Sequence, residues 1–185
     1  MKAFVFDTET TGLIRNRTLK LEKQPEIIEF YGCLTDLKTG KIKKELDTFL
    51  APSKALSDIP APGDRKTITE ITGITNEMLK GAPTFKEKAK EIVTLIEKSP
   101  IVIAHNASFD KEMINIEAER LGITIMWPRI ICTVEATIAL KGFRLSLSAL
   151  HEELFNEPFT GAHRAKVDVS ALVRCCVELF QRGFL

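Results

Sequence analysis

Apolar and polar positions along the first third of the chain predict a sheet. Residues 2–7 are apolar on both faces, which is typical of a central, buried strand. Residues 26–34 predict a second strand, and residues 42–50 pair back on it across the turn DLKTG. Prolines and a glycine within residues 51–66 predict a loop after this three-strand meander.

The pattern then changes to a helical period. Two short helical turns broken at Gly73 precede a helix over residues 85–98, capped by Thr84. PIVIAH predicts a short strand, and SFDKEMINIEAERLG a helix that Gly122 closes. Short elements follow at 130–140 and 146–155, and the last helix runs from about 165 to 181. This order predicts a three-layer α/β domain, a mixed sheet flanked by helices.

Composition adds few constraints. The 185 residues are expected to form one domain, residues 1–185, with 44% hydrophobic and 28% charged residues. The net charge of +1 excludes a global basic field, so a polyanion would have to be held by local charge or by metal. No signal peptide and no apolar run of about 20 residues is evident, so a cytoplasmic protein without membrane association is expected.

The four cysteines have no zinc-ligand spacing and indicate a reducing compartment. Adjacent Cys175 and Cys176 are interpreted as core residues, because free cysteine commonly packs as a small hydrophobe. A redox pair at these two positions is the less favoured alternative.

Two acids end the first predicted strand. Asp7 and Glu9 are two residues apart, so they share a face if the strand persists that far. They lie at its carboxyl end, where open α/β sheets place their ligands. Taken alone, this pair is better explained by a cap or turn formed by Asp7 and a solvated Glu9.

Further chemistry lies in AHNASFD, residues 104–110, and HRAKVD, residues 163–168. Asp110 falls in the first turn of a helix, where an acid also suits the helix dipole. Asp168 shares a helical face with Leu172, Cys175 and Leu179, so it should be buried and need a partner. A buried hydrogen bond or a cation shared with the first two acids would each satisfy it. His151 is expected at the surface.

Four carboxylates from three segments are oxygen ligands suited to hard cations such as Mg²⁺ or Mn²⁺. Two such ions roughly 4 Å apart are an arrangement used for in-line displacement at phosphorus. Bound cations would explain why Asp7 and Glu9 end a buried strand.

These motifs, in this order, resemble the DEDDh 3′–5′ exonucleases. D-x-E at 7–9, H-N-x-x-F-D at 105–110 and H-x-x-x-x-D at 163–168 carry the resemblance, together with EIIEF, TGITNEML and SLSAL. The resemblance covers nearly the whole chain. The family that the chain resembles includes the proofreading epsilon subunit of bacterial DNA polymerase III. It implies a ribonuclease H-like fold with a five-stranded mixed sheet.

The resemblance also implies the site. Asp7, Glu9 and Asp168 would bind one divalent ion, while Asp7 and a water held by Asp110 would serve a second. His163 would be the general base for the attacking water. The terminal nucleotides would be held or wedged by a further set: Thr10, Leu13, His105, Asn106 and Phe109. Packing is an equal alternative for Leu13 and Phe109, and ordering of the strand end is slightly favoured for His105 and Asn106.

Two features depart from the family pattern. The stretch IRNRTLKLEK, residues 14–23, is longer than usual and could receive a phosphate backbone, although a solvated charge run is the commoner explanation. The chain ends after the last helix, without the extension that tethers the epsilon subunit to its polymerase, so a polymerase partner is not expected.

The function predicted is a metal-dependent 3′–5′ exonuclease acting on single-stranded ends, with DNA favoured over RNA. The alternatives are an exoribonuclease of the same family and, less favoured, a non-catalytic nucleic-acid-binding module. A monomer and a dimer both remain open.

Overall fold

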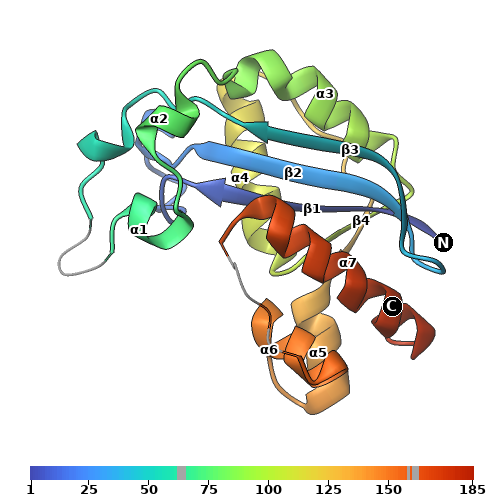
Figure 1. Cartoon of the computed structure of the whole chain (residues 1–185). Helices are drawn as coiled ribbons and strands as arrows, with labels where there is room; N and C mark the ends of the chain where they lie inside the picture. The colour runs from blue at the N-terminus through green and yellow to red at the C-terminus, as the bar shows by residue number, and fades with distance from the viewer. Residues whose placement is uncertain (62–65, 158, 160–162) are drawn as a thin grey trace.

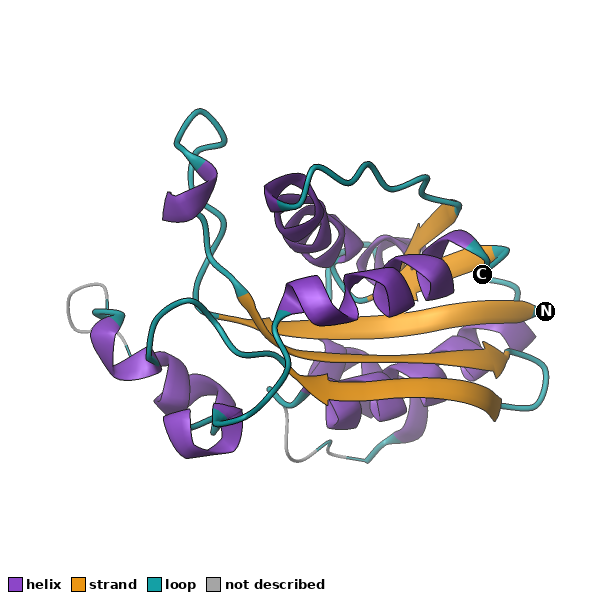
Figure 2. Ribbon diagram, turned by 90° about the horizontal axis from the view of Figure 1, so that it is seen from above, coloured by secondary structure: helices purple, strands orange, loops and turns teal. Residues whose placement is uncertain are grey.

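A computed structural model of the protein describes residues 1–61, 66–157, 159 and 163–185. Its centre is a mixed sheet of five strands in the order β3-β2-β1-β4-β5, with helices on both faces (Figures 1 and 2). The predicted three-layer α/β fold is therefore confirmed. The strands are β1 (Lys2–Thr10), β2 (Ile27–Asp36), β3 (Lys41–Phe49), β4 (Ile101–Ala104) and β5 (Arg129–Cys132).

The first three strands form the predicted antiparallel meander, and β4 and β5 continue the sheet in parallel with β1. The pairing of β4 with β1 reaches Val5 opposite Ile103, and β1 then runs on to Thr10. The end of β1 is thus open on its β4 side. β1 is longer than the apolar run 2–7 predicted, and its last residues carry polar side chains that are buried or half-buried.

The helices follow the predicted punctuation. Gly73 separates α1 from α2 with a φ of 71°, and Thr84 closes a capping box at the start of α3. Of the predicted loop 51–66, residues 62–65 lie outside the described residues, and a 3-10 turn, η2, occupies part of the rest. The helical elements are η1 (Leu21–Lys23), η2 (Leu56–Asp58), α1 (Ile68–Thr72), α2 (Asn76–Leu79), α3 (Phe85–Glu97), α4 (Ala107–Arg120), α5 (Thr133–Lys141), α6 (Leu147–Phe155) and α7 (Ala165–Gln181).

The alternation of β1 assigns its residues to two cores. Phe4 and Phe6 point to the face covered by α3 and α4, where they pack near Phe30. Ala3 and Val5 point to the face covered by α7. Figure 1 shows α7 crossing this second face over β1 and β2. By the period of two, Asp7 and Glu9 belong to the α7 face.

Two predictions about single residues had different outcomes. Cys175 and Cys176 are both buried and carry no disulfide, as expected of core residues. The surface position predicted for His151 is wrong, because its ring is only 6% exposed. It packs on Phe155 and its ring contacts the Glu157 carbonyl, since α6 lies against α7 on this side.

Within the described part of the chain, no helix is both long and apolar enough to cross a bilayer.

Candidate active site

The end of β1 places two carboxylates beside each other on one face. The strand persists through Asp7 and Glu9 as far as Thr10, which was the condition for the two acids to share a face. A register shift between Glu9 and Thr10 marks where pairing with β2 becomes irregular. The acids therefore sit where the sheet stops and the chain turns away.

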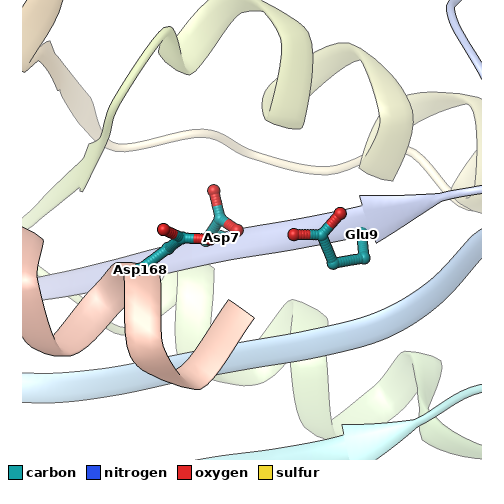
Figure 3. A group of neighbouring side chains, drawn as sticks. All are labelled: Asp7, Glu9 and Asp168. Carbon is teal, nitrogen blue, oxygen red and sulfur yellow. The ribbon is translucent and has the colours of Figure 1, made fainter. Parts of the chain in front are cut away.

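The start of α7 brings a third carboxylate to the same place. Asp168 lies on the buried side of the helix, as its spacing from Leu172, Cys175 and Leu179 predicted. One carboxylate oxygen from each of Asp7, Glu9 and Asp168 lies within 4.8 Å of the other two. Figure 3 shows the three groups gathered between β1 and the first turn of α7. Segments about 160 positions apart in the chain are joined here by the packing of α7 on the sheet.

Asp110 reaches this edge from the first turn of α4 and is 3% exposed. Its Oδ1 accepts hydrogen bonds from the backbone N–H of Thr8, at 3.1 Å, and from the Thr8 hydroxyl, at 2.7 Å. The carboxylate is thereby tied to the residue between Asp7 and Glu9. Asp110 is close enough to Asp7 to be the first of the acids that raise its pKa.

The electrostatics of the group are unfavourable without a cation. Burial, followed by repulsion from Asp110 and Glu9, raises the pKa of Asp7 well above its usual range. Burial and then Asp168 raise the pKa of Glu9 to about 8. Burial likewise raises the pKa of Asp110 to about 7, against the Thr8 hydrogen bonds, and it raises the pKa of Asp168. Of the four predicted acids, the structure gathers the oxygens of Asp7, Glu9 and Asp168, while Asp110 lies outside that group and acts on Asp7 through its charge.

The residues present fit a divalent cation. Among the described residues, no lysine or arginine forms an ion pair with the three gathered carboxylates. Arg164 lowers the pKa of Glu9 from a distance but is hydrogen-bonded elsewhere. All the donor atoms are carboxylate oxygens, the ligands that Mg²⁺ and Mn²⁺ prefer.

His163 lies just before α7 with an exposed side chain. Its φ of 70° is left-handed, which is uncommon for a residue other than glycine. Its backbone N–H donates to Asp168 Oδ2 at 2.8 Å, and the Arg164 N–H donates to the same oxygen at 3.1 Å. The position of this histidine is therefore linked directly to the Asp168 carboxylate.

Sequence reasoning missed a fifth acid. Glu29 lies on β2 opposite Glu9 and is only 2% exposed. Its carboxylate accepts from the Arg164 guanidinium, with the shortest contact 2.9 Å, and from the Ala165 N–H at 2.9 Å. A glutamate within the apolar string EIIEF was the available signal, because a charged residue is rarely buried unless it is paired.

Three of the residues predicted to hold the terminal nucleotides are Thr10, Leu13 and Phe109, and they differ in exposure. Thr10 ends β1, and its hydroxyl donates to the Gly12 carbonyl at 2.9 Å. Leu13 is 71% exposed, which does not fit the packing alternative, whereas Phe109 is half-buried against the α3–α4 core. Contacts of any of these residues with a nucleotide stay a prediction.

His105 and Asn106 order the connection between β4 and α4. The Nδ1 of His105 is 2.9 Å from the Thr133 hydroxyl, and burial lowers the pKa of this histidine to about 4, so the ring is neutral at pH 7. Asn106 adopts a left-handed φ of 66° directly before α4, a conformation that asparagine tolerates. Both findings agree with the ordering role, and the nucleotide contact remains open.

The basic stretch after Leu13 is partly neutralised by the protein itself. Arg17 forms ion pairs with Glu112 and Glu119 on α4. Arg120 donates from α4 to the carbonyls of Leu21, Gln24 and Pro25, which fastens the stretch to the molecule.

Comparison with known proteins identifies the class. Residues 4–175 match the family model described as Exonuclease. The chain therefore belongs to the exonuclease family, and the predicted membership is confirmed.

Relatives and solved structures refine this. The chain is 30% identical over 182 residues to "DNA polymerase III PolC-type" of Caldanaerobacter subterraneus subsp. tengcongensis, covering 96% of this chain and 11% of that protein. It is 34% identical over 179 residues to the Thermotoga maritima protein of the same name, covering 96% and 11%. The chain thus spans about a tenth of the length of these relatives.

Two solved structures share the fold. The nuclease domain of 3′hExo, described as a DEDDh family member bound to rAMP, has a TM-score of 0.74 at 18% identity and covers 98% of this chain and 92% of its own. Exonuclease X, in complex with 5′ overhanging duplex DNA, has a TM-score of 0.66 at 22% identity and covers 98% and 93%. The predicted ribonuclease H-like, DEDDh-type fold is confirmed.

Proposed function

We propose that residues 1–185 form one exonuclease domain that hydrolyses the terminal phosphodiester at the 3′ end of single-stranded DNA and releases nucleoside 5′-monophosphates. The observation that carries this proposal is the convergence of Asp7, Glu9 and Asp168 within 4.8 Å on an exonuclease fold. Membership of the family supplies the reaction class, and the open end of β1 supplies a place for a strand terminus.

The roles follow from the positions of the acids. Asp7, Glu9 and Asp168 would hold one Mg²⁺ or Mn²⁺, while Asp7 and a water on Asp110 would serve a second. When bound, such ions would neutralise the scissile phosphate and lower the pKa of the attacking water. The Thr8 hydrogen bonds hold the Asp110 carboxylate against the end of β1.

His163 would take the proton from the attacking water. Its side chain is exposed beside Asp168, so a water in front of the acids is within its reach only if the start of α7 is well placed. Removal of that proton leaves hydroxide to attack phosphorus in line, and the 3′-oxygen of the penultimate nucleotide departs.

The 3′ end of the nucleic-acid strand would be bound by residues that lie beyond Glu9. Leu13, exposed three residues beyond β1, and Phe109, one residue before Asp110, would contact the terminal bases, with Thr10 holding the backbone. Base stacking on an aromatic ring is worth about 1–3 kcal/mol per base. His105 and Asn106 support this wall by ordering the turn after β4.

Exoribonuclease activity is the second candidate. One structural neighbour is described as bound to rAMP and another as recognising a histone mRNA stem-loop, while a third holds duplex DNA. Matched DNA and RNA oligonucleotides of one sequence separate the two candidates, because only a ribose-tolerant site cleaves both. The PolC-type relatives favour DNA.

The test uses a 5′-labelled single-stranded DNA oligomer with Mg²⁺ or Mn²⁺. Stepwise shortening from the 3′ end, with release of 5′-mononucleotides that EDTA abolishes, is the expected result. Asp7→Ala, which removes a ligand of both ions, and His163→Ala, which removes the general base, should each lower the rate by at least about 100-fold. Unchanged rates in either variant would contradict the mechanism. Binding without hydrolysis by the unaltered protein would favour a non-catalytic module.

A further inference from the structure

The buried Glu29 and the partly exposed Arg164 form an ion pair beside the acidic cluster. Arg164 donates from Nη2 to Glu29 Oε1 at 2.9 Å and from Nε to both carboxylate oxygens, at 3.2 and 3.3 Å. The guanidinium carbon also lies 5.3 Å from the centre of the Phe49 ring. One aromatic ring and one carboxylate thus hold this arginine on the sheet.

The pair holds the peptide that carries His163. Three successive backbone N–H groups, those of His163, Arg164 and Ala165, donate to two carboxylates. The first two bind Asp168 Oδ2, and the third binds Glu29 Oε2 at 2.9 Å. The left-handed backbone at His163 is therefore held from the side of α7 and from β2 together.

Stability alone is a poor explanation for this arrangement. Burying the Glu29 carboxylate carries a dehydration cost, which offsets much of its attraction to Arg164. Here the buried carboxylate also stands opposite Glu9 and adds to the repulsion that Asp7, Glu9 and Asp168 experience. This arrangement does not favour folding, so it is better explained by the position it gives to the peptide of His163.

We propose that Glu29 and Arg164 are positioning residues of the active site. The pair docks the start of α7 on β2 and so sets the distance of the His163 imidazole from the two acids of β1. This inference rests on the proposed function, in which His163 takes the proton of the attacking water.

A double-mutant cycle tests the inference. Arg164→Met should lower kcat for a single-stranded DNA oligomer by at least tenfold and leave KM within about threefold, because a misplacement of about 1 Å can lower a rate 100-fold. Arg164→Lys, which keeps the charge but loses the two-pronged contact, should lie in between. In a His163→Ala background, Arg164→Met should lower the residual rate by less than about threefold. Equal losses in both backgrounds would overturn the inference.

Lys166→Met is the matched control. This neighbour pairs with an exposed acid, Asp47, at 2.9 Å, and its loss should leave kcat unchanged. If Arg164→Met fails to fold by circular dichroism, the cycle is run with Arg164→Lys.

A second readout does not require hydrolysis. In the metal-free protein, the backbone order parameter of His163 should fall from the rigid range near 0.85 to below about 0.6 in Arg164→Met. An unchanged order parameter would overturn the inference. If the unaltered protein hydrolyses no nucleic acid, the proposed function fails while this measurement still decides whether the pair positions His163.

Discussion

At the scale of single residues, the site is an arrangement of like charges that the protein does not neutralise. Glu9 shows this most clearly, since burial and Asp168 raise its pKa to about 8. The glutamate would carry a proton at neutral pH in the absence of metal. A bound cation would release that proton, so metal binding and proton release should be coupled.

The raised pKa of Glu9 gives a prediction for the free energy of unfolding of the metal-free protein. Between the reference value of 4.5 and the folded value of about 8, folded Glu9 keeps a proton that the unfolded chain has released. Stability should therefore fall as pH rises through this window. Glu9→Gln removes the effect and should raise the free energy of unfolding at pH 8 by at least about 1 kcal/mol, close to the value of one pKa unit. Urea unfolding in EDTA at pH 5 and pH 8 measures both quantities.

The metal-dependent activity of Glu9→Gln should fall by at least about 100-fold. Changing a residue that only contacts a metal ligand typically costs about 10–100-fold, and loss of a direct ligand should cost at least as much. Glu22→Gln, at an exposed acid outside the cluster, is the control and should change stability by less than about 0.5 kcal/mol. A less stable Glu9→Gln protein at pH 8 would show that Glu9 is not strained in the metal-free state.

At the scale of elements, three starts and ends converge: the end of β1, the first turn of α4 and the first turn of α7. Much of this could be predicted from local patterns. The period of two placed Asp7 and Glu9 on one face, and the period of 3.6 placed Asp168 on the buried side of α7. Both predictions depend only on residues that are close together in the sequence.

Contacts between distant segments could not be predicted in this way. Glu29 and Arg164 are 135 positions apart, and each has a sufficient local interpretation, one within a strand and one before a helix. His151 failed for the same reason, because its burial depends on the packing of α6 against α7. The convergence itself was inferred from the order of motifs and required the fold to place it.

The third helix offers a prediction about an element remote from the acids. The Thr84 side chain accepts from the Glu87 N–H, and the Glu87 carboxylate accepts from the Thr84 N–H at 2.7 Å. Thr84→Ala should lower the free energy of unfolding by about 1 kcal/mol, because a helix start then loses its cap. Urea unfolding gives the value, and the rate per folded molecule should not change.

Thr94→Ala in the body of the same helix is the matched control. It replaces the same residue type where no capping bond is formed and should be neutral or slightly stabilising, since alanine is the better helix former. Equal losses in the two variants would mean that the cap contributes nothing specific.

At the scale of the whole molecule, basic and acidic residues balance in number, and several basic side chains form ion pairs with acids of the same protein. The sequence carries 26 basic and 25 acidic residues, a net charge of +1. Three basic side chains of the segments that follow β1 or begin α7 have acidic partners: Arg17 with Glu112 and Glu119, Arg164 with Glu29, and Lys166 with Asp47. Attraction of a DNA strand should therefore depend on bound metal more than on the protein surface.

The salt dependence of binding measures this directly. In EDTA, where hydrolysis is not expected, a fluorescent single-stranded oligomer should bind weakly, and log K should fall with log salt at a slope shallower than about −2, equivalent to two or three phosphates. Anisotropy titrations between about 50 and 200 mM salt give the slope. Arg17→Ala should leave it unchanged, because that guanidinium is already held by two glutamates on α4. A slope steeper than about −4, or a clear loss on Arg17→Ala, would instead mean that the stretch 14–23 releases its internal partners and lies along the phosphate backbone.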